Sequence, residues 1–428
     1  MLLLILLLTV LLSFFLTRSI KYWVELENIV DDPNSDPRRK KQKKPIPLLG
    51  NLGFTFAAAL VVFLLWLTGA IAYNFGLKAP VEDINNLILN RPTIIDKELL
   101  QNFIMRSVDS SLADLYYALQ LVYSEGRRLF WIGLSLLILT LGGYVDDKYH
   151  TSPKWQVLFI TTYILIALFG GDLVLTNFSY PFNQILPETY WARALLSFAW
   201  IGFCVAATKF LDGLDGLVTL VGFTGLLIVA AISFTLPIAQ PVPAILALVL
   251  AASILGFIPF NFPNAKMYLG EGGSEIIGFL LGVFSLWSGA KLATVSMGIG
   301  LFILDWFLVM IMRIKDKRNP ITSSDRFHWH HRLFDLGLTK LQVLAITSIF
   351  LIIFSSLGLN SPTSQKPLII MFEIGVLIIL LFITTTLSRW KKAKALANPK
   401  QDNMAVVSNQ NIDTEKPIKK PVKKHKKK

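Results

Sequence analysis

Asp212 and Asp215 lie three residues apart in the run Asp-Gly-Leu-Asp-Gly, between two long apolar segments. Carboxylates at this spacing share a helix face or line a single turn, and the adjoining glycines let a ligand approach the backbone closely. Acidic side chains at the mouth of membrane helices are costly and usually line a hydrated cavity that has a function. An ordinary polar turn that caps a helix is the alternative. The rest of the chain decides between them, according to whether it brings matching chemistry to the same membrane side.

Three further polar clusters follow apolar segments in the same way. They are the 142–148 stretch with Asp146 and Asp147, the 261–274 stretch with Asn261, Tyr268, Gly270 and Glu271, and the 325–332 stretch with Arg326, His328, His330, His331 and Arg332. Carboxylates suit Mg²⁺ or Mn²⁺, which typically takes one or two of them together with substrate phosphates. One of several clustered carboxylates can instead have a raised pKa and act as a base. Glycines at a helix N-terminus, arginines and histidines all offer donors to phosphate oxygens.

Each cluster also has a structural interpretation. The Asp146–Asp147 pair would cap a helix end, and the glycine run after Tyr268 would be a tight turn. Three histidines within four residues would bind Zn²⁺, although no cysteine accompanies them. Asp305, inside an apolar segment, would be a buried polar group or a support for the site, and the more distant Glu373 favours a structural role.

Composition places the chain in a membrane. Of its 428 residues, 54 % are hydrophobic and only 16 % charged, and the mean hydropathy of +0.57 is too high for a soluble domain of this length. The single cysteine, Cys204, excludes an internal disulfide framework. The sequence therefore predicts an all-α, polytopic helical bundle.

Eleven segments approach the roughly 20 residues needed to cross hydrocarbon. They cover about 1–22, 51–74, 129–145, 155–175, 191–208, 217–236, 242–260, 274–289, 291–312, 341–359 and 368–388. Loops after the odd-numbered segments carry the excess of Lys and Arg, including six bases within 38–44. Because basic loops stay in the cytoplasm, the N-terminus is expected outside and the C-terminus inside. All four polar clusters then lie on the cytoplasmic side, which favours one shared site.

Two regions stand apart from the bundle. Within the domain 1–390, the segment 74–126 is an expected extracytoplasmic insert with amphipathic surface helices at 94–100 and 105–119. The tail, 391–428, is basic and polar and is expected to be disordered in the cytoplasm. Much of the net charge of +13 is in this tail, for which contact with anionic lipid is a simpler explanation than nucleic-acid binding.

The clusters together carry a resemblance. The order Asp-Asp, Asp-Gly-Leu-Asp-Gly, Phe-Asn…Ala-Lys…Gly-acid-x-Gly-Ser and Asp-Arg-x-His-x-His-His-Arg-Leu resembles the polyprenyl-phosphate N-acetylhexosamine-1-phosphate transferase superfamily. The match covers roughly 25–345, including the Pro-Ile-Pro-Leu-Leu-Gly loop at 45–50. The histidine motif looks more like the undecaprenyl-phosphate GlcNAc-1-phosphate branch than the phospho-N-acetylmuramoyl-pentapeptide branch.

The resemblance implies a reaction and roles. A polyprenyl phosphate would attack a UDP-N-acetylhexosamine at the cytoplasmic face of the plasma membrane, with release of UMP and with Mg²⁺, or Mn²⁺, neutralising charge. The implied catalytic residues are Asp146 as base, Asp147, Asp212, Asp215, His328, His330 and His331; the substrate-binding residues are Lys209, Gly213, Leu214, Asn261, Tyr268, Gly270, Arg326 and Arg332; and the metal ligands are Glu271 and Asp147. A homodimer is left open.

Four residues depart from the family pattern. Lys209 stands where the family usually has Asn, Glu271 replaces the usual metal-binding Asp, and Asn264 replaces a Pro. Glu275 is an additional acid one turn after Glu271. These departures keep three alternatives open: the muramoyl-pentapeptide activity, an inactive scaffold, and, from another class, an ion-coupled transporter. The transporter requires charges near the bilayer midplane and an internal repeat, whereas these charges sit at helix ends and no repeat is visible.

Overall fold

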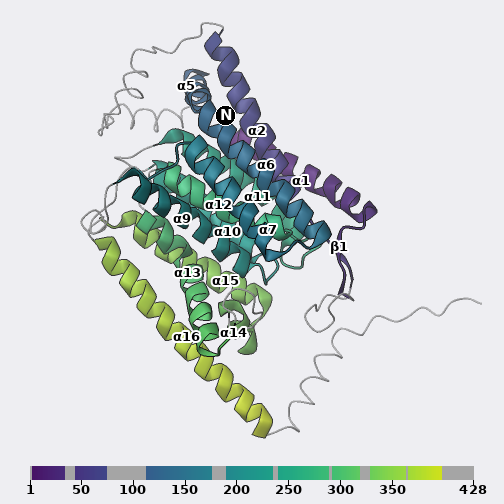
Figure 1. Ribbon diagram of the computed structural model, residues 1–428, viewed down its shortest axis with the longest axis vertical. Coiled ribbons are helices and arrows are strands. Elements are labelled where there is room, and N and C mark those ends of the chain that lie inside the picture. Colours follow the sequence, from purple (N-terminus) through teal and green to yellow (C-terminus); the bar gives the residue numbers. More distant parts are fainter. Residues whose placement is uncertain are drawn as a thin grey trace, which may run out of the picture.

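A computed structural model describes residues 2–33, 44–74, 112–175, 189–234, 240–288, 292–318, 328–362 and 365–397. The described chain is almost entirely helical (Figure 1). The helices are α1 (Leu2–Leu26), α2 (Asn51–Asn74), α5 (Leu112–Ser124), α6 (Gly126–Tyr149), α7 (Pro153–Leu165), the π-helix η2 (Ile166–Gly170), α9 (Tyr190–Leu211), α10 (Leu217–Phe234), α11 (Pro241–Asn261), α12 (Glu271–Trp287), α13 (Leu292–Lys315), α14 (Trp329–Asp335), α15 (Lys340–Asn360) and α16 (Lys366–Ala397). The polytopic helical membrane fold is therefore confirmed.

A helix lies at each of the eleven predicted spans. Among the described helices, nine are long and apolar enough to cross a membrane. The two remaining predicted spans correspond to α12, with 17 residues, and α13, with 24. The number of crossings and the outward orientation of the N-terminus stay predictions.

Helix α12 lies at the centre of the bundle. It packs against α6, α9 and α10, and nearly all of its side chains are buried. Glycines permit the close approach of its neighbours: a Cβ atom added to Gly278 would lie 2.6 Å from the backbone oxygen of Cys204 on α9. Small residues are the usual means of close helix packing in membranes, where the lipid offers no hydrophobic driving force between helices.

The C-terminal helices form a second group, drawn in green and yellow in Figure 1. Helix α13 contacts both α15 and α16, while α10 joins this group to the central helices. The short helix α14 lies against α15 and α16. It contains His330 and His331 and follows His328 directly, so the position of this group determines where the histidines lie.

A two-stranded hairpin precedes α2. Strand β1 (Val30–Asp31) pairs antiparallel with β2 (Ile46–Pro47), with Val30 opposite Pro47. The chain after β2 is hydrogen-bonded to the loop before α12: the Gly50 N–H donates to the Tyr268 carbonyl at 2.9 Å. The 45–50 loop is thereby attached to the candidate site.

Two predicted elements differ from the structure. The predicted span 155–175 ends earlier, as α7 continued by the π-helix to Gly170. The surface helix expected at 105–119 overlaps α5, which instead packs along α2 and buries Val122. Helix α16 continues past the predicted start of the tail to Ala397, and the domain boundary stays a prediction. The expected helix at 94–100 and the tail beyond Ala397 lie outside the described residues.

Candidate active site

The ends of α6 and α12 meet at two glycines. A Cβ atom added to Gly143 would lie 2.5 Å from the Cα atom of Gly272, so the two backbones are in direct contact. One turn beyond Gly143, the Oδ1 atom of Asp147 accepts a hydrogen bond from the Glu271 N–H at 3.0 Å. Asp147 thus caps a helix 124 residues further along the chain, and its negative charge is favourable at that helix N-terminus.

The second carboxylate oxygen of Asp147 suits a metal ion. Oδ2 is buried and accepts no hydrogen bond from the described part of the chain, which is unusual for a buried charged oxygen and calls for a ligand or a proton. Within the described ranges no three acidic, histidine or cysteine side chains converge on a point that could hold a metal by themselves. A magnesium ion that arrives with substrate phosphates needs only one or two carboxylates, so Asp147 and the exposed Glu271 fit that group.

Asp146 is held much more firmly than its neighbour. Oδ1 accepts hydrogen bonds from the N–H and the hydroxyl of Thr151, and Oδ2 accepts one from the Gln156 amide at 2.9 Å. Both carboxylate oxygens of Asp146 thus already have donors. The geometry therefore suits Asp146 to positioning the loop between α6 and α7, and leaves Asp147 with the oxygen that is available for chemistry.

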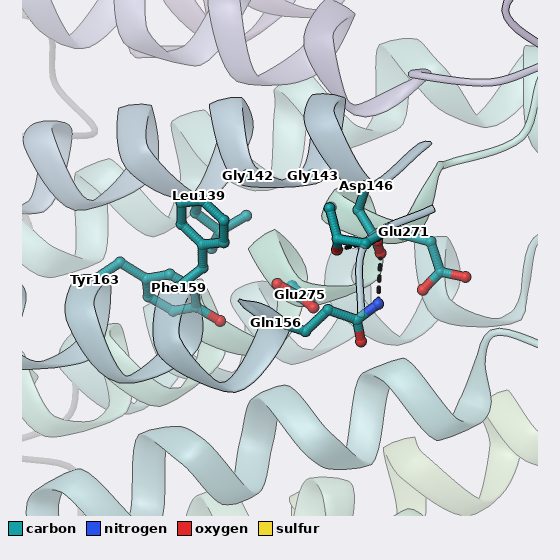
Figure 2. A pocket seen from close by; sticks show the side chains of 11 residues that line it. Leu139, Gly142, Gly143, Asp146, Gln156, Phe159, Tyr163, Glu271 and Glu275 are labelled. Carbon is teal, nitrogen blue, oxygen red and sulfur yellow. Dashed lines mark hydrogen bonds between the residues drawn. The ribbon is translucent and has the colours of Figure 1, made fainter. Parts of the chain in front are cut away.

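Asp146, Thr151, Gln156, Glu271 and Glu275 line an open pocket that is continuous with solvent. Figure 2 shows its two ends: Asp146, Gln156 and Glu275 lie at one, and Leu139, Phe159 and Tyr163 at the other. The pocket lies between α6, α7 and α12. It therefore joins a polar mouth to an apolar wall.

The Asp-Gly-Leu-Asp-Gly run forms the turn between α9 and α10. Gly216 has φ +82°, a left-handed conformation that favours glycine. Its N–H donates to Asn261 Oδ1 at 2.9 Å, and the Asn261 amide donates to the Met267 carbonyl. The buried amide of Asn261 fixes this turn to the loop before α12, and its predicted substrate contact stays a prediction.

Asp215 and Asp212 have different environments on this turn. Asp215 accepts hydrogen bonds from the Lys340 ammonium and from the Ala265 N–H. Asp212 remains exposed to solvent, yet desolvation by the surrounding protein, followed by the negative charges of Glu271 and Asp215, raises its pKa to about 7. Asp212 thus changes its charge near neutral pH.

The histidine cluster faces the same turn. A Cβ atom added to Gly213 would lie 3.0 Å from Nε2 of His330 and 3.9 Å from Nε2 of His331. His328 Nδ1 lies 2.9 Å from Oδ2 of Asp305, and the other oxygen of Asp305 accepts the Trp329 N–H. Asp305 is therefore a hydrogen-bonded buried group that also orients His328, so both interpretations that the sequence left open apply to it.

Arg332 contacts the C-terminal helices. It donates to the Thr385 hydroxyl on α16 and contacts the sulfur of Met312 on α13. It therefore ties α14 to these helices, and its predicted phosphate contact stays a prediction. Arg326 lies outside the described residues.

Lys209 lies beside the acids of α12. Its ammonium group lies 2.7 Å from Glu275 Oε1 and 3.6 Å from Glu271 Oε2. Three of the residues that depart from the family pattern are therefore neighbours in space. Lys209 balances the two glutamates, and its predicted substrate contact stays a prediction.

The remaining predicted residues line the site through their backbone or their packing. Leu214 is buried in the hydrophobic core. Gly270 has φ +83°, and a Cβ atom there would lie 2.5 Å from Oδ2 of Asp147. Tyr268 is half-buried, and burial raises the pKa of its phenol, which stays protonated. Gly270 is therefore required to make room for the Asp147 carboxylate.

Three residues of the site were missed from the sequence. Thr151 and Gln156 follow α6 by a few residues, and Lys340 begins α15. Each is an ordinary polar residue at a helix terminus, with no motif around it. The only available signal is their position on the predicted cytoplasmic side.

The comparisons with known proteins agree with this site. The model of the family glycosyl transferase family 4 matches residues 129–289, a range that runs from the first turn of α6 to the end of α12 and holds all the carboxylates described above for this site except Asp305. A probable undecaprenyl-phosphate N-acetylglucosaminyl 1-phosphate transferase of Bacillus subtilis is 33 % identical over 259 residues, which cover 59 % of this chain and 71 % of the relative. The chain belongs to glycosyl transferase family 4.

Other members of glycosyl transferase family 4 are more distant. An undecaprenyl-phosphate alpha-N-acetylglucosaminyl 1-phosphate transferase of Thermotoga maritima is 27 % identical over 270 residues, 63 % of this chain and 81 % of the relative. A phospho-N-acetylmuramoyl-pentapeptide-transferase of Staphylococcus haemolyticus is 24 % identical over 279 residues, 59 % of this chain and 86 % of the relative. The N-acetylglucosaminyl branch is thus the more similar of these two.

Proposed function

We propose that this membrane enzyme transfers N-acetylglucosamine 1-phosphate from UDP-N-acetylglucosamine to a polyprenyl phosphate. A phosphate oxygen of the lipid attacks the β-phosphorus of the donor. The bond between that phosphorus and the oxygen bridging it to the α-phosphate breaks, and UMP leaves. The observation that carries this proposal is the convergence of the Asp-Asp, Asp-Gly-Leu-Asp-Gly and histidine motifs at helix ends of a glycosyl transferase family 4 member.

The residues support different parts of this reaction. Oδ2 of Asp147, which has no donor in the described chain, is available for a metal ion or for the proton of the lipid phosphate, whereas both oxygens of Asp146 are occupied. His330 and His331, facing the turn at Gly213, offer donors to the pyrophosphate. We therefore assign the reacting carboxylate to Asp147, in place of the expected Asp146.

Mg²⁺ is part of this proposal, with Asp147 and Glu271 as the residues that would hold it. Bound there, it would neutralise the charge that develops between the two phosphates. Because the basic loops surround the polar clusters, we place the site at the cytoplasmic face of the plasma membrane.

A turnover assay with three donors tests the proposal. Membranes containing the enzyme are incubated with a polyprenyl phosphate and radiolabelled UDP-GlcNAc, UDP-GalNAc or UDP-MurNAc-pentapeptide, and the lipid is extracted. Label is expected in the lipid with UDP-GlcNAc, together with one UMP per transfer. Label from only the MurNAc-pentapeptide donor would contradict the substrate assignment, and no label from any donor would favour an inactive scaffold.

A pair of carboxylate variants supplies the control. Asp147→Asn removes the available oxygen's charge and is expected to lower turnover by about 10² or more. Asp172→Asn changes an exposed carboxylate at the far end of the α6–α7 helix pair and should leave turnover unchanged. Equal turnover in the two variants would remove Asp147 from the reaction.

A further inference from the structure

The Lys209 ammonium on α9 lies among three acceptors from two other helices, α7 and α12. It donates to Glu275 Oε1 on α12 at 2.7 Å and to Gln156 Oε1 on α7 at 3.3 Å, and it lies 3.6 Å from Glu271 Oε2. The side chains of Lys209 and Glu275 are only 23 % and 11 % exposed, whereas that of Glu271 is 56 % exposed. Lys209 therefore connects a buried acid to an accessible one.

The buried contact between Lys209 and Glu275 is explained by the stability of the fold. Removing one member of a buried ion pair leaves an uncompensated charge, while replacing both by apolar groups is often neutral. Glu275 thus requires Lys209 for the fold. The exposed Glu271 carboxylate is already solvated by water. The stability of the fold alone therefore does not explain why the Lys209 ammonium lies close to it.

The network also reaches Asp146. An ammonium can only donate and a carboxylate can only accept, so the Gln156 amide between Lys209 and Asp146 has one possible orientation. Its oxygen faces Lys209, and its nitrogen donates to Asp146 Oδ2 at 2.9 Å. Figure 2 shows this hydrogen bond from Gln156 to Asp146. Hydrogen bonds therefore connect Lys209 to Asp146 on α6 through Gln156, and directly to Glu275 on α12.

We infer that the Lys209 ammonium, together with Glu275, sets how strongly the Glu271 carboxylate binds a divalent cation. A fixed positive charge beside Glu271 weakens the binding of a free divalent cation. It favours one that arrives already paired with phosphates, whose negative charge offsets that of the ammonium. Lys209 is a positioning residue in this role. The inference rests on the proposed function only for the identity of the phosphates. The expected effect of Lys209 on cation binding does not depend on the proposed function.

The two single variants have opposite expected effects. Lys209→Met leaves Glu275 and Glu271 unbalanced, and even with water-like screening a unit charge about 6 Å from a divalent cation changes its binding about tenfold. Mn²⁺ should therefore bind about tenfold more tightly to Lys209→Met. Glu275→Gln removes one of the two negative charges beside the Lys209 ammonium, so the positive charge acts more strongly on Glu271. Mn²⁺ binding should therefore weaken several-fold.

The experiment measures Mn²⁺ binding to the purified full-length protein by electron paramagnetic resonance, and thermal unfolding with EDTA or Mn²⁺. Lys209→Met should unfold several degrees lower in EDTA and recover with Mn²⁺. The double variant Lys209→Met/Glu275→Leu should approach the unaltered protein in both measurements. Lys209→Arg should preserve both. As a control, Arg128→Met breaks a half-buried ion pair with Glu125 at the other end of α6 and should leave Mn²⁺ binding unchanged.

The outcomes separate the two proposals. Equal Mn²⁺ affinity in the unaltered protein, Lys209→Met and Glu275→Gln would overturn the inference and leave a structural ion pair. The same holds if Lys209→Met and Arg128→Met change Mn²⁺ affinity alike. The opposite shifts support the inference even if none of the three UDP-sugars is a substrate, in which case only the proposed function fails.

Discussion

Gly143→Ala is the most direct perturbation of the candidate site. The added Cβ atom would lie 2.5 Å from the Cα atom and 3.0 Å from the nitrogen of Gly272. Both are backbone atoms of α12, so no side-chain rotation relieves the contact. Ordinary carbon contacts are about 3.5–4.0 Å, so α6 and α12 must separate by about 1 Å. Overpacking of this kind typically lowers the free energy of unfolding by about 1–3 kcal/mol.

The separation reaches the site one helical turn later. The hydrogen bond from the Glu271 N–H to Asp147 Oδ1 is 3.0 Å long, and about 1 Å more would break it. Asp147 and Glu271 would then no longer be held together at the start of α12. Because a displacement of about 1 Å in a reacting group can lower a rate about 10²-fold, Gly143→Ala should reduce turnover by about that factor.

The same helix offers a matched control. A Cβ atom at Gly133 would meet no atom within 4 Å. Gly133→Ala should therefore keep full turnover and gain up to about 1 kcal/mol from helix propensity. Initial rates of lipid labelling and thermal unfolding in detergent measure both variants. Equal turnover in Gly143→Ala and Gly133→Ala would refute the reasoning that backbone contact positions Asp147.

Three further predictions concern the turn and the histidines. Asp305→Asn should lower kcat by about tenfold or more and leave KM for the UDP-sugar nearly unchanged, because His328 loses its carboxylate partner; a change in KM alone would contradict an orienting role. Lys340→Gln should raise KM for the UDP-sugar several-fold, since Asp215 loses its ion pair, and unchanged initial-rate kinetics would remove Lys340 from the site. With the pKa of Asp212 raised to about 7, its negative charge is lost as the pH falls through 7, so turnover should fall there. Asp212→Asn should lower the maximal turnover and flatten its fall on the acid side of the pH profile. An unaltered pH profile in this variant would contradict a role for Asp212.

The sequence alone predicted the helices and the common location of the motifs. A bilayer accepts only long apolar segments whose backbone groups are satisfied internally, so hydropathy located a helix at each of eleven positions. The polar runs at 142–148, 212–216 and 268–274 stood at helix ends on one predicted side. That spacing was sufficient to expect a shared site, because costly polar groups in a membrane protein gather where water and ligands reach them.

Only the tertiary structure decided which side chain contacts which. Lys209 meets Glu275 across 66 residues of chain, and Lys340 meets Asp215 across 125. Asn261 and Arg332 have residue types that suit a substrate, yet their donors are used within the protein. Residue type limits what a side chain can bind, but its distance and orientation depend on how helices far apart in sequence pack, and here two glycines in contact set that packing.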